Sequence, residues 1–212
     1  MVSLECFFDC ASPWGYMGFL NLQQLASRLG VEVEWKPVVV GFVFSQSNPG
    51  VYLNRRIMTA PLKGLNELRD LDRWADYTGI ELNNPPRCGH PVNSVRCMRA
   101  CIALQPQGKL VAFAAAAGEA LWRDGRNLRE DAVLADIARS IGVDPAWLFT
   151  AIESPEVKER LKANVDELSS RGGFGVPTIF VDRRHMYWGN NRLPLVEDRL
   201  RRAIRAPVAA AS

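Results

Sequence analysis

The first forty residues constrain the fold most, because they follow the pattern strand, helix, strand. Leu4–Asp9 is a short apolar run with aromatic residues, which is typical of a buried strand. Ser12 and Pro13 then predict a helix start, since serine caps a helix and proline suits its first position. Gly30 ends the helix, and residues 31–36 alternate apolar and charged side chains, as in a half-buried strand. This unit predicts two parallel strands joined by a right-handed crossover.

The C-terminal part of the chain returns to strands. Residues 178–181 are β-rich, residues 182–184 can form a turn, and residues 185–188 can return as a hairpin partner. Apolar residues at helical spacing from Leu193 to Ala203 predict a last helix after Gly189. The order strand, strand, helix completes a four-stranded sheet with the N-terminal unit.

The middle of the chain is predicted to be almost wholly helical. Asp144 and Ser154, each followed by proline, predict two helix starts, and Asn127 with Glu130 resembles a capping box. We therefore expect an α/β fold in which residues 1–45 and 172–212 form the sheet domain. Residues 46–171 are expected to form an inserted, all-helical domain.

Composition and charge exclude several classes of protein. A chain that is 48% hydrophobic and 23% charged is ordinary for a globular protein, and a net charge of +3 does not favour nucleic acid as a partner. No segment reaches the ~18 consecutive apolar residues of a membrane span. The N-terminus has no basic region ahead of an apolar run, so we expect no signal peptide, no membrane partner and a cytoplasmic protein.

The cysteines predict neither a disulfide framework nor a metal site. There are 5 cysteines, an odd number, without a C-x-x-C pair, and the 2 histidines lie far apart in sequence. Cys97 and Cys101 are spaced i, i+4 on a predicted helix and are expected to be small core residues. This usage fits a reducing compartment.

Two positions could carry chemistry. Ser12 lies at the expected positive pole of a helix, where its hydroxyl could donate a hydrogen bond to an anion, although the residues alone favour a plain helix cap. A Ser-His-Asp nucleophile is not indicated by any spacing. Pro177 precedes a β-rich run; it is an ordinary strand-entry proline unless its peptide bond with Val176 is cis.

Several segments, taken in order, resemble one family. Residues 8–16 (Phe-Asp-Cys-Ala-Ser-Pro-Trp-Gly-Tyr) resemble the active-site turn of thioredoxin-fold proteins of the DsbA type, with Ser12 and Gly15 at the places of the two cysteines. Residues 174–178 resemble the cis-proline strand of that fold. Residues 188–193 (Trp-Gly-Asn-Asn-Arg-Leu) and the helical segments 70–75 and 86–96 are similar to 2-hydroxychromene-2-carboxylate isomerases, relatives of kappa-class glutathione transferases.

The resemblance implies a thioredoxin-like fold and a glutathione site. In the family the serine, here Ser12, hydrogen-bonds the glutathione sulfur, and the residue before the cis-proline, here Val176, pairs its backbone with the cysteinyl part. The remaining implied contacts are Asn48 at the glycyl end and Asn190 and Asn191 at the γ-glutamyl end. Asn191 stands where the family has aspartate, and the family lysine after the second strand has no counterpart here.

The implied reaction converts 2-hydroxychromene-2-carboxylate to trans-o-hydroxybenzylidenepyruvate through reversible attack by a glutathione thiolate. The substrate is a small, flat aromatic carboxylate, for which Trp14, Phe42 and Phe44 are candidate walls and Arg87 and Asn93 candidate anchors. A homodimer is also expected from the relatives. Three alternatives stay open, namely a kappa-type transferase or peroxidase, a disulfide oxidoreductase, and a non-catalytic glutathione-binding module. Ser12 and Gly15 disfavour the oxidoreductase because exchange needs a thiolate.

Overall fold

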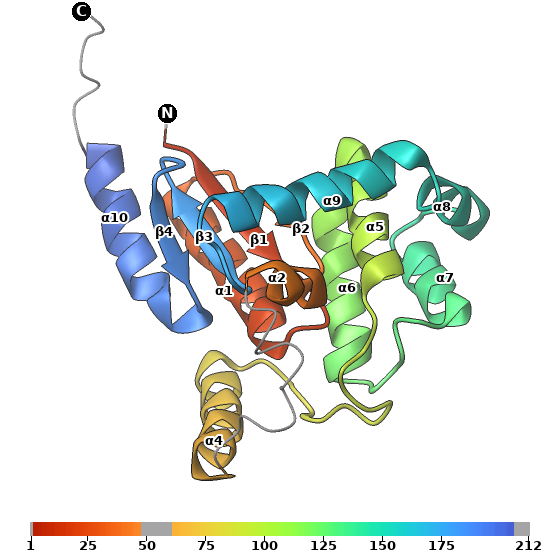
Figure 1. Cartoon of the computed structure of the whole chain (residues 1–212), viewed down its shortest axis with the longest axis horizontal. Coiled ribbons are helices and arrows are strands. Elements are labelled where there is room, and N and C mark those ends of the chain that lie inside the picture. The colour runs from red at the N-terminus through yellow and green to blue at the C-terminus, as the bar shows by residue number, and fades with distance from the viewer. Residues whose placement is uncertain (1, 48–60, 206–212) are drawn as a thin grey trace, which may run out of the picture.

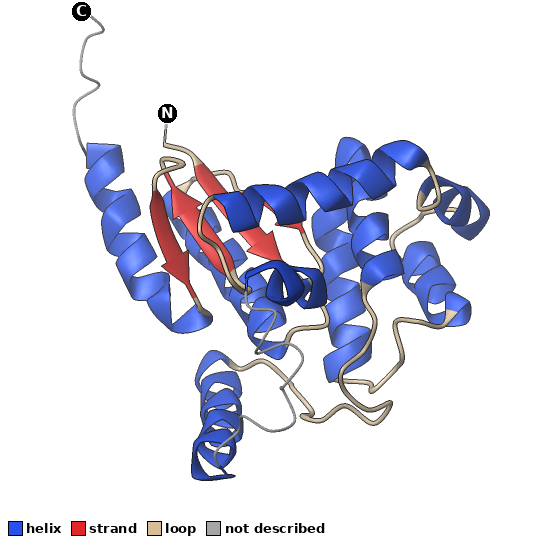
Figure 2. Cartoon of the chain, in the orientation of Figure 1, coloured by secondary structure: helices blue, strands red, loops and turns tan. Residues whose placement is uncertain are grey.

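A computed structural model describes residues 2–47 and 61–205 (Figure 1). Figure 2 shows a sheet flanked by helices, with a group of helices at the other end of the molecule. In chain order the elements are β1 (Leu4–Phe8), α1 (Pro13–Leu29), β2 (Glu34–Pro37), α2 (Val40–Ser47), α4 (Pro61–Thr78), α5 (Val95–Leu104), η1 (Gln105–Gln107), α6 (Leu110–Trp122), α7 (Asp131–Ser140), α8 (Pro145–Ala151), α9 (Pro155–Ser170), β3 (Thr178–Val181), β4 (His185–Trp188), η2 (Asn190–Arg192) and α10 (Leu193–Arg205).

The sheet has the strand order β2-β1-β3-β4. β1 is parallel to β2, with Cys6 opposite Trp35, and antiparallel to β3, with Cys6 opposite Ile179. β3 and β4 form the hairpin that closes the sheet. The predicted α/β class and the four-stranded sheet are therefore confirmed.

The central strand β1 is buried on both faces, as its apolar run requires. Leu4, Cys6 and Phe8 face a large core that also contains side chains of α1, α5, α6 and α10. Phe7 faces a second core with residues of α2 and α9. Helix α9 crosses this second face in Figure 1, so the inserted segment supplies part of the layer that covers the sheet.

Local start and stop signals place most helix ends. Ser12 caps α1, and Gly30 ends it in the left-handed conformation at φ 64°. Ser154 accepts a hydrogen bond from the Val157 amide and caps α9, as its Ser-Pro sequence predicts. The predicted capping box at Asn127 is wrong: α7 begins four residues later, and the Asn127 side chain accepts from the Arg129 amide in a turn instead.

The second strand differs from its predicted form. It begins at Glu34 rather than Val31, and Trp35, Lys36 and Pro37 are all buried. The alternating pattern suggested a half-solvated strand, but α9 covers the polar side. Lys36 is buried because two carboxylates, Glu5 and Glu167, pair with its ammonium group there.

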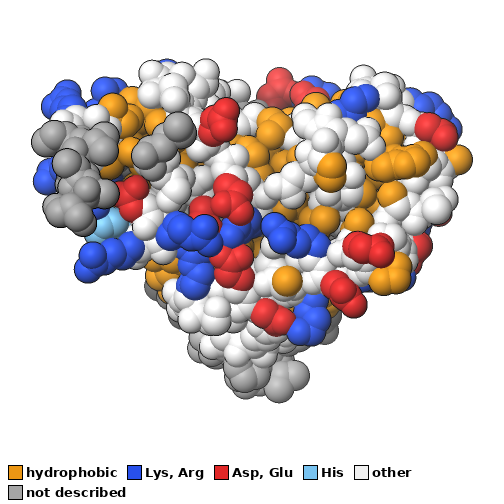
Figure 3. Space-filling model, turned by 90° about the horizontal axis from the view of Figure 1, so that it is seen from above, with side chains coloured by type: hydrophobic (Ala, Val, Ile, Leu, Met, Phe, Trp, Pro, Cys, Tyr) orange, Lys and Arg blue, Asp and Glu red, His pale blue; other side chains and the backbone are white. Residues whose placement is uncertain are grey.

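Basic and acidic side chains are interspersed on the face seen in Figure 3. The arginines of α10 follow the same rule, since Arg201 and Arg202 pair with acidic residues one turn earlier on the helix. Within the described part of the chain, none of the helices is both long and apolar enough to cross a membrane.

Candidate functional site

Ser12 lies between the end of β1 and the start of α1. Its backbone is extended at φ −95° and ψ 124°, its hydroxyl oxygen accepts from the Gly15 amide at 3.1 Å, and Pro13 follows at the first helical position. The side chain is half-buried. The predicted cap is thus confirmed, and the hydroxyl occupies the positive pole of a 17-residue helix.

The proline loop before β3 packs directly on this helix start. The peptide bond between Val176 and Pro177 is cis. A Cβ on Gly18 would lie 2.5 Å from Cγ of Pro177, and a Cβ on Gly15 would lie 3.2 Å from Cγ2 of Val176. Two glycines on one face of α1 therefore permit the close approach that brings Ser12 and Val176 together.

Gly15 stands at the position of the second cysteine of a two-cysteine motif, and the backbone there leaves no space for a side chain. A Cβ at this position would lie 2.6 Å from the backbone carbonyl oxygen of Asp9, which is too close for any side chain without a backbone shift. The turn therefore lacks both thiols of a two-cysteine motif, and its second position has no room for one. Disulfide exchange through this turn is excluded by composition and by space.

Asp9 holds the turn in place through three hydrogen bonds. Sequence reasoning did not identify this residue as part of the site. One carboxylate oxygen accepts from the Ala11 amide at 2.9 Å; the other accepts from the Val40 amide at 2.8 Å and the Ser94 hydroxyl at 2.9 Å. The side chain is fully buried, and burial raises the pKa of its carboxyl, although these hydrogen bonds act in the opposite direction. Asp9 thus joins the turn to the N-termini of α2 and α5.

A helix and a loop of the segment between β2 and β3 also hold the turn, through its carbonyl groups. The indole N–H of Trp122 in α6 donates to the Cys10 carbonyl at 2.8 Å, and Nε2 of His90 lies 3.2 Å from the Ala11 carbonyl. Trp122 is fully buried, and the two rings are in contact with centroids 5.5 Å apart. Neither partner could be found from a local sequence signal, because each lies far along the chain from the turn.

The hairpin end reaches the same place. The Gly189 amide donates to the Pro177 carbonyl at 2.9 Å, so the predicted Asn190 and Asn191 follow directly beside the proline loop. Asn190 is buried, and its amide group accepts from Asn21 at 2.9 Å and donates to the Met17 sulfur at 3.4 Å. Asn191 is exposed.

The Asn190 side chain therefore serves first to dock the hairpin end on α1. The function predicted for it, contact with the γ-glutamyl end of glutathione, would have to come from its backbone or from the exposed Asn191.

The predicted substrate residues are dispersed around the turn. Trp14 packs on a small apolar cluster of α1 and α4, Phe42 of α2 is 48% exposed, and Phe44 of α2 is half-buried. The Arg87 side-chain stem lies against Gly125. The remaining predicted residues are Asn93, whose side chain accepts from the Val95 amide at the start of α5, and Asn48, which lies outside the described residues.

Cys10 is the thiol nearest in sequence to Ser12, and its environment disfavours the thiolate that disulfide exchange needs. It is buried, and its pKa lies well above the ordinary thiol value: a hydrogen bond with Cys101 favours the thiolate, but contact with Cys97 and burial outweigh it. A role for Cys10 in disulfide exchange is not supported.

Comparison with known proteins gives the same picture. The chain is 28% identical over 204 residues to 2-hydroxychromene-2-carboxylate isomerase of Sphingobium xenophagum, covering 93% of this chain and 97% of that protein. It is 28% identical over 219 residues to glutathione S-transferase kappa 2 of Caenorhabditis elegans, covering 97% and 94%. A solved 2-hydroxychromene-2-carboxylate isomerase has the same fold, with a TM-score of 0.79 at 23% identity and 99% of both chains covered.

Residues 3–201 match the DSBA-like thioredoxin domain family. The resemblance stated from the sequence is thereby confirmed, and relatives that are isomerases and glutathione transferases support an enzyme. Because the match spans most of the chain and the observed sheet topology agrees with it, this chain belongs to the DSBA-like thioredoxin domain family.

Proposed function

We propose that this chain is a glutathione-dependent isomerase that converts 2-hydroxychromene-2-carboxylate to trans-o-hydroxybenzylidenepyruvate in the breakdown of bicyclic aromatic compounds. One observation carries the proposal. A serine, rather than a cysteine, caps the helix beside the cis-proline loop, and Gly15 leaves no room for a second thiol. The site suits a thiol brought by a ligand.

The residues at the turn fit a glutathione thiol. The Ser12 oxygen accepts from the Gly15 amide, and its own proton is not donated to any of the described residues, so it can donate to a sulfur anion. Val176 precedes β3, and its peptide groups lie outside the ladders that join β3 to β1 and β4. An extended peptide such as glutathione could pair with that backbone.

Magnitudes show why both the helix and the hydroxyl are needed. A free thiol has a pKa of about 8.5, and lowering it by one unit requires about 1.4 kcal/mol. A helix N-terminus typically supplies only ~0.3–1 kcal/mol. The hydrogen bond from Ser12 must supply the remainder, since charge-assisted bonds contribute about 1.5–3 kcal/mol.

Glutathione would supply a thiolate that adds reversibly to a conjugated carbon and so permits rotation about the former double bond. The chain contributes positioning: Ser12 orients the sulfur, and Val176 holds the peptide backbone. The exposed Phe42 on α2 offers an apolar surface for a flat aromatic acid. Because α2 begins at Val40, which Asp9 binds, this surface is fixed relative to the turn.

A kappa-type glutathione transferase or peroxidase is the second candidate. The equal 28% identity to the kappa 2 protein favours it, and the same Ser12 chemistry would serve it. The two activities differ in stoichiometry, because the isomerase returns its glutathione and the transferase consumes it.

The proposal also includes a homodimer in the cytoplasm. All five cysteines are free, which fits a reducing compartment.

The test is a turnover assay with purified protein, glutathione and 2-hydroxychromene-2-carboxylate, followed by absorbance. Ser12→Ala should lower the rate about 100-fold or more, as loss of one oriented donor does elsewhere. Ser154→Ala is a matched control, since Ser154 is also a helix cap followed by proline but lies on α9. Each substitution should cost about 1 kcal/mol of stability, and only Ser12→Ala should lose activity.

Three results would count against the isomerase. Turnover that does not need glutathione would show that glutathione is not the cofactor of the reaction. Consumption of glutathione with other electrophiles, without isomerisation, would favour the transferase. Failure of glutathione to bind, measured by calorimetry, would favour a non-catalytic module that has kept the fold.

A further inference from the structure

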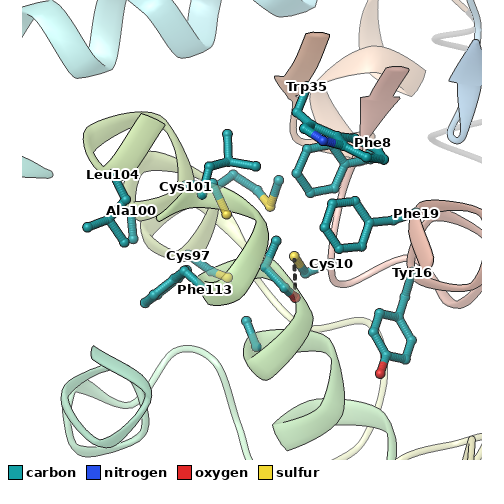
Figure 4. Close-up of a cluster of buried hydrophobic side chains, with 14 of the residues drawn as sticks. Phe8, Cys10, Tyr16, Phe19, Trp35, Cys97, Ala100, Cys101, Leu104 and Phe113 are labelled. Atoms are coloured by element: carbon teal, nitrogen blue, oxygen red, sulfur yellow. Dashed lines mark hydrogen bonds between the residues drawn. The ribbon is translucent and has the colours of Figure 1, made fainter. Parts of the chain in front are cut away.

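Three thiols from two distant parts of the chain converge next to the turn that carries Ser12. Cys10 comes from the loop after β1, and Cys97 and Cys101 lie one turn apart on α5. Their three Sγ atoms all lie within 4.8 Å of one another. Figure 4 shows the two α5 cysteines and Cys10 approaching one another between Phe113 and the aromatic side chains of the sheet core.

The surroundings of this cluster are apolar. Cys97 and Cys101 are fully buried, and Cys10 is 2% exposed. A weak hydrogen bond joins Cys10 Sγ to the Ala114 carbonyl oxygen at 3.6 Å. Within the described residues the cluster contains neither histidine nor carboxylate. A site with three sulfur ligands and no nitrogen or oxygen ligand selects soft, thiophilic elements.

We propose that Cys10, Cys97 and Cys101 form a three-sulfur binding site for a trivalent thiophilic element of the arsenite class. Trivalent arsenous acid, As(OH)₃, would condense with the three thiols. Three As–O bonds break, three As–S bonds form, and the three thiol protons leave with the hydroxyl groups as three water molecules. Arsenic and sulfur keep their oxidation states, so neither an oxidant nor a reductant is required.

Charge selects the trivalent element over other soft ions. Three thiolates around monovalent copper would carry a net charge of −2, and around a divalent ion −1, in a core that also holds the buried Asp9. The trivalent complex is neutral, and uncompensated charge in such a core is costly.

The cluster is closed, so binding requires a local opening between the turn and α5. Such openings occur without global unfolding, and the bound state then gains stability by mass action. The element would join the loop that carries Ser12 to the inserted helices, in addition to the contact from Asp9 to Ser94. The inference is independent of whether glutathione binds.

The experiment is native mass spectrometry of the reduced, full-length protein after long incubation with sodium arsenite and a non-thiol reductant. The expected result is one added arsenic atom with loss of three hydrogens, and a raised unfolding temperature. Cys10→Ala, Cys97→Ala and Cys101→Ala should each abolish that mass. Cys6→Ala, a buried cysteine outside the cluster, and Cys88→Ser, the exposed one, should leave it unchanged.

A second measurement needs no variant. Alkylation of the wild-type protein under denaturing conditions, before and after arsenite, should show Cys10, Cys97 and Cys101 protected together while Cys88 still reacts. A protein that takes up no arsenic would overturn the proposal. So would uptake that persists in Cys10→Ala with the three-hydrogen mass loss, or protection of a different set of cysteines.

Discussion

A carboxylate is buried at each end of β1, and the two carboxylates differ in their partners: one is paired with cations and the other accepts from neutral donors. Glu5, near the start of the strand, is 1% exposed and pairs with Lys36 at 2.8 Å and Arg171 at 2.7 Å. Asp9, just beyond the strand, is 0% exposed and, among the described residues, accepts from two amides and one hydroxyl. Burial works to raise both pKa values, but for Glu5 the hydrogen bonds from Arg171 and Lys36 outweigh it and hold its pKa below the ordinary value.

The different partners indicate different roles: Glu5 stabilises the packing of α9 on the sheet, and Asp9 positions the turn. At Glu5 the cations attach α9 to the sheet, and the Arg171 guanidinium also lies 3.6 Å from the centroid of the Phe180 ring. At Asp9 the donors are neutral and position the turn.

The largest effect on stability is expected from Glu5→Gln. The change leaves Lys36 and Arg171 with Glu167 as their remaining shared acidic partner, and breaking a buried ion pair typically costs about 3 kcal/mol or more. Chemical denaturation measures the loss. The turn is untouched, so turnover of the folded protein should be within about twofold of wild type; a large loss of activity would contradict the separation of the two ends.

Asp9→Ala should cost about 2 kcal/mol of stability, because the Ala11 and Val40 amides and the Ser94 hydroxyl lose their acceptor. Its effect on catalysis should exceed that of Glu5→Gln. Displacement of a positioned group by about 1 Å can lower a rate ~100-fold. Steady-state kinetics on the two variants make the comparison, and equal rates in both would show that Asp9 does not position Ser12.

The two carboxylates should also have opposite effects on how the free energy of unfolding changes with pH in the acid range. The pKa of Glu5 lies below the ordinary 4.5, so the unfolded chain binds more protons there and stability falls as pH drops from about 4.5. The pKa of Asp9 lies above the ordinary 3.8, so its contribution is greatest below that pH and is lost as pH rises through the folded value.

Unfolding free energies measured between about pH 3 and 6 test this difference. Removing Glu5 should make the acid limb shallower than in wild type, and removing Asp9 should make it steeper. A change of the same sign in both variants would mean that the two groups do not differ in their partners as described.

The smallest effect is expected from Arg28→Ala on the surface. Arg28 pairs with Glu197 at 3.2 Å, but its side chain is 63% exposed. Solvent and salt screen such a pair, so the loss should stay within about 0.5 kcal/mol. A loss as large as that of Glu5→Gln would show that burial is not what makes the β1 pair important.

Much of the fold could be predicted from short-range signals. Ser12 with Pro13 and Gly30 set the ends of α1, and the β-rich run at residues 178–181 gave β3, because caps, proline and glycine act on the backbone locally. The order of strands and helices then led to the correct sheet. The capping box at Asn127 was wrong because the same side chain can close a turn as well as a helix.

The features of the candidate site also fall into those set by consecutive residues and those that depend on distant segments. The sequence by itself determined the serine cap, the proline loop and the absence of a two-cysteine motif, since each is written in a few consecutive residues. Only the tertiary structure decided that Asp9, Trp122 and His90 hold the turn, that Asn190 docks on α1, and that Cys10 meets Cys97 and Cys101. Those contacts join segments far apart in the chain, and burial and hydrogen bonding between such segments exist only once the helices have packed on the sheet.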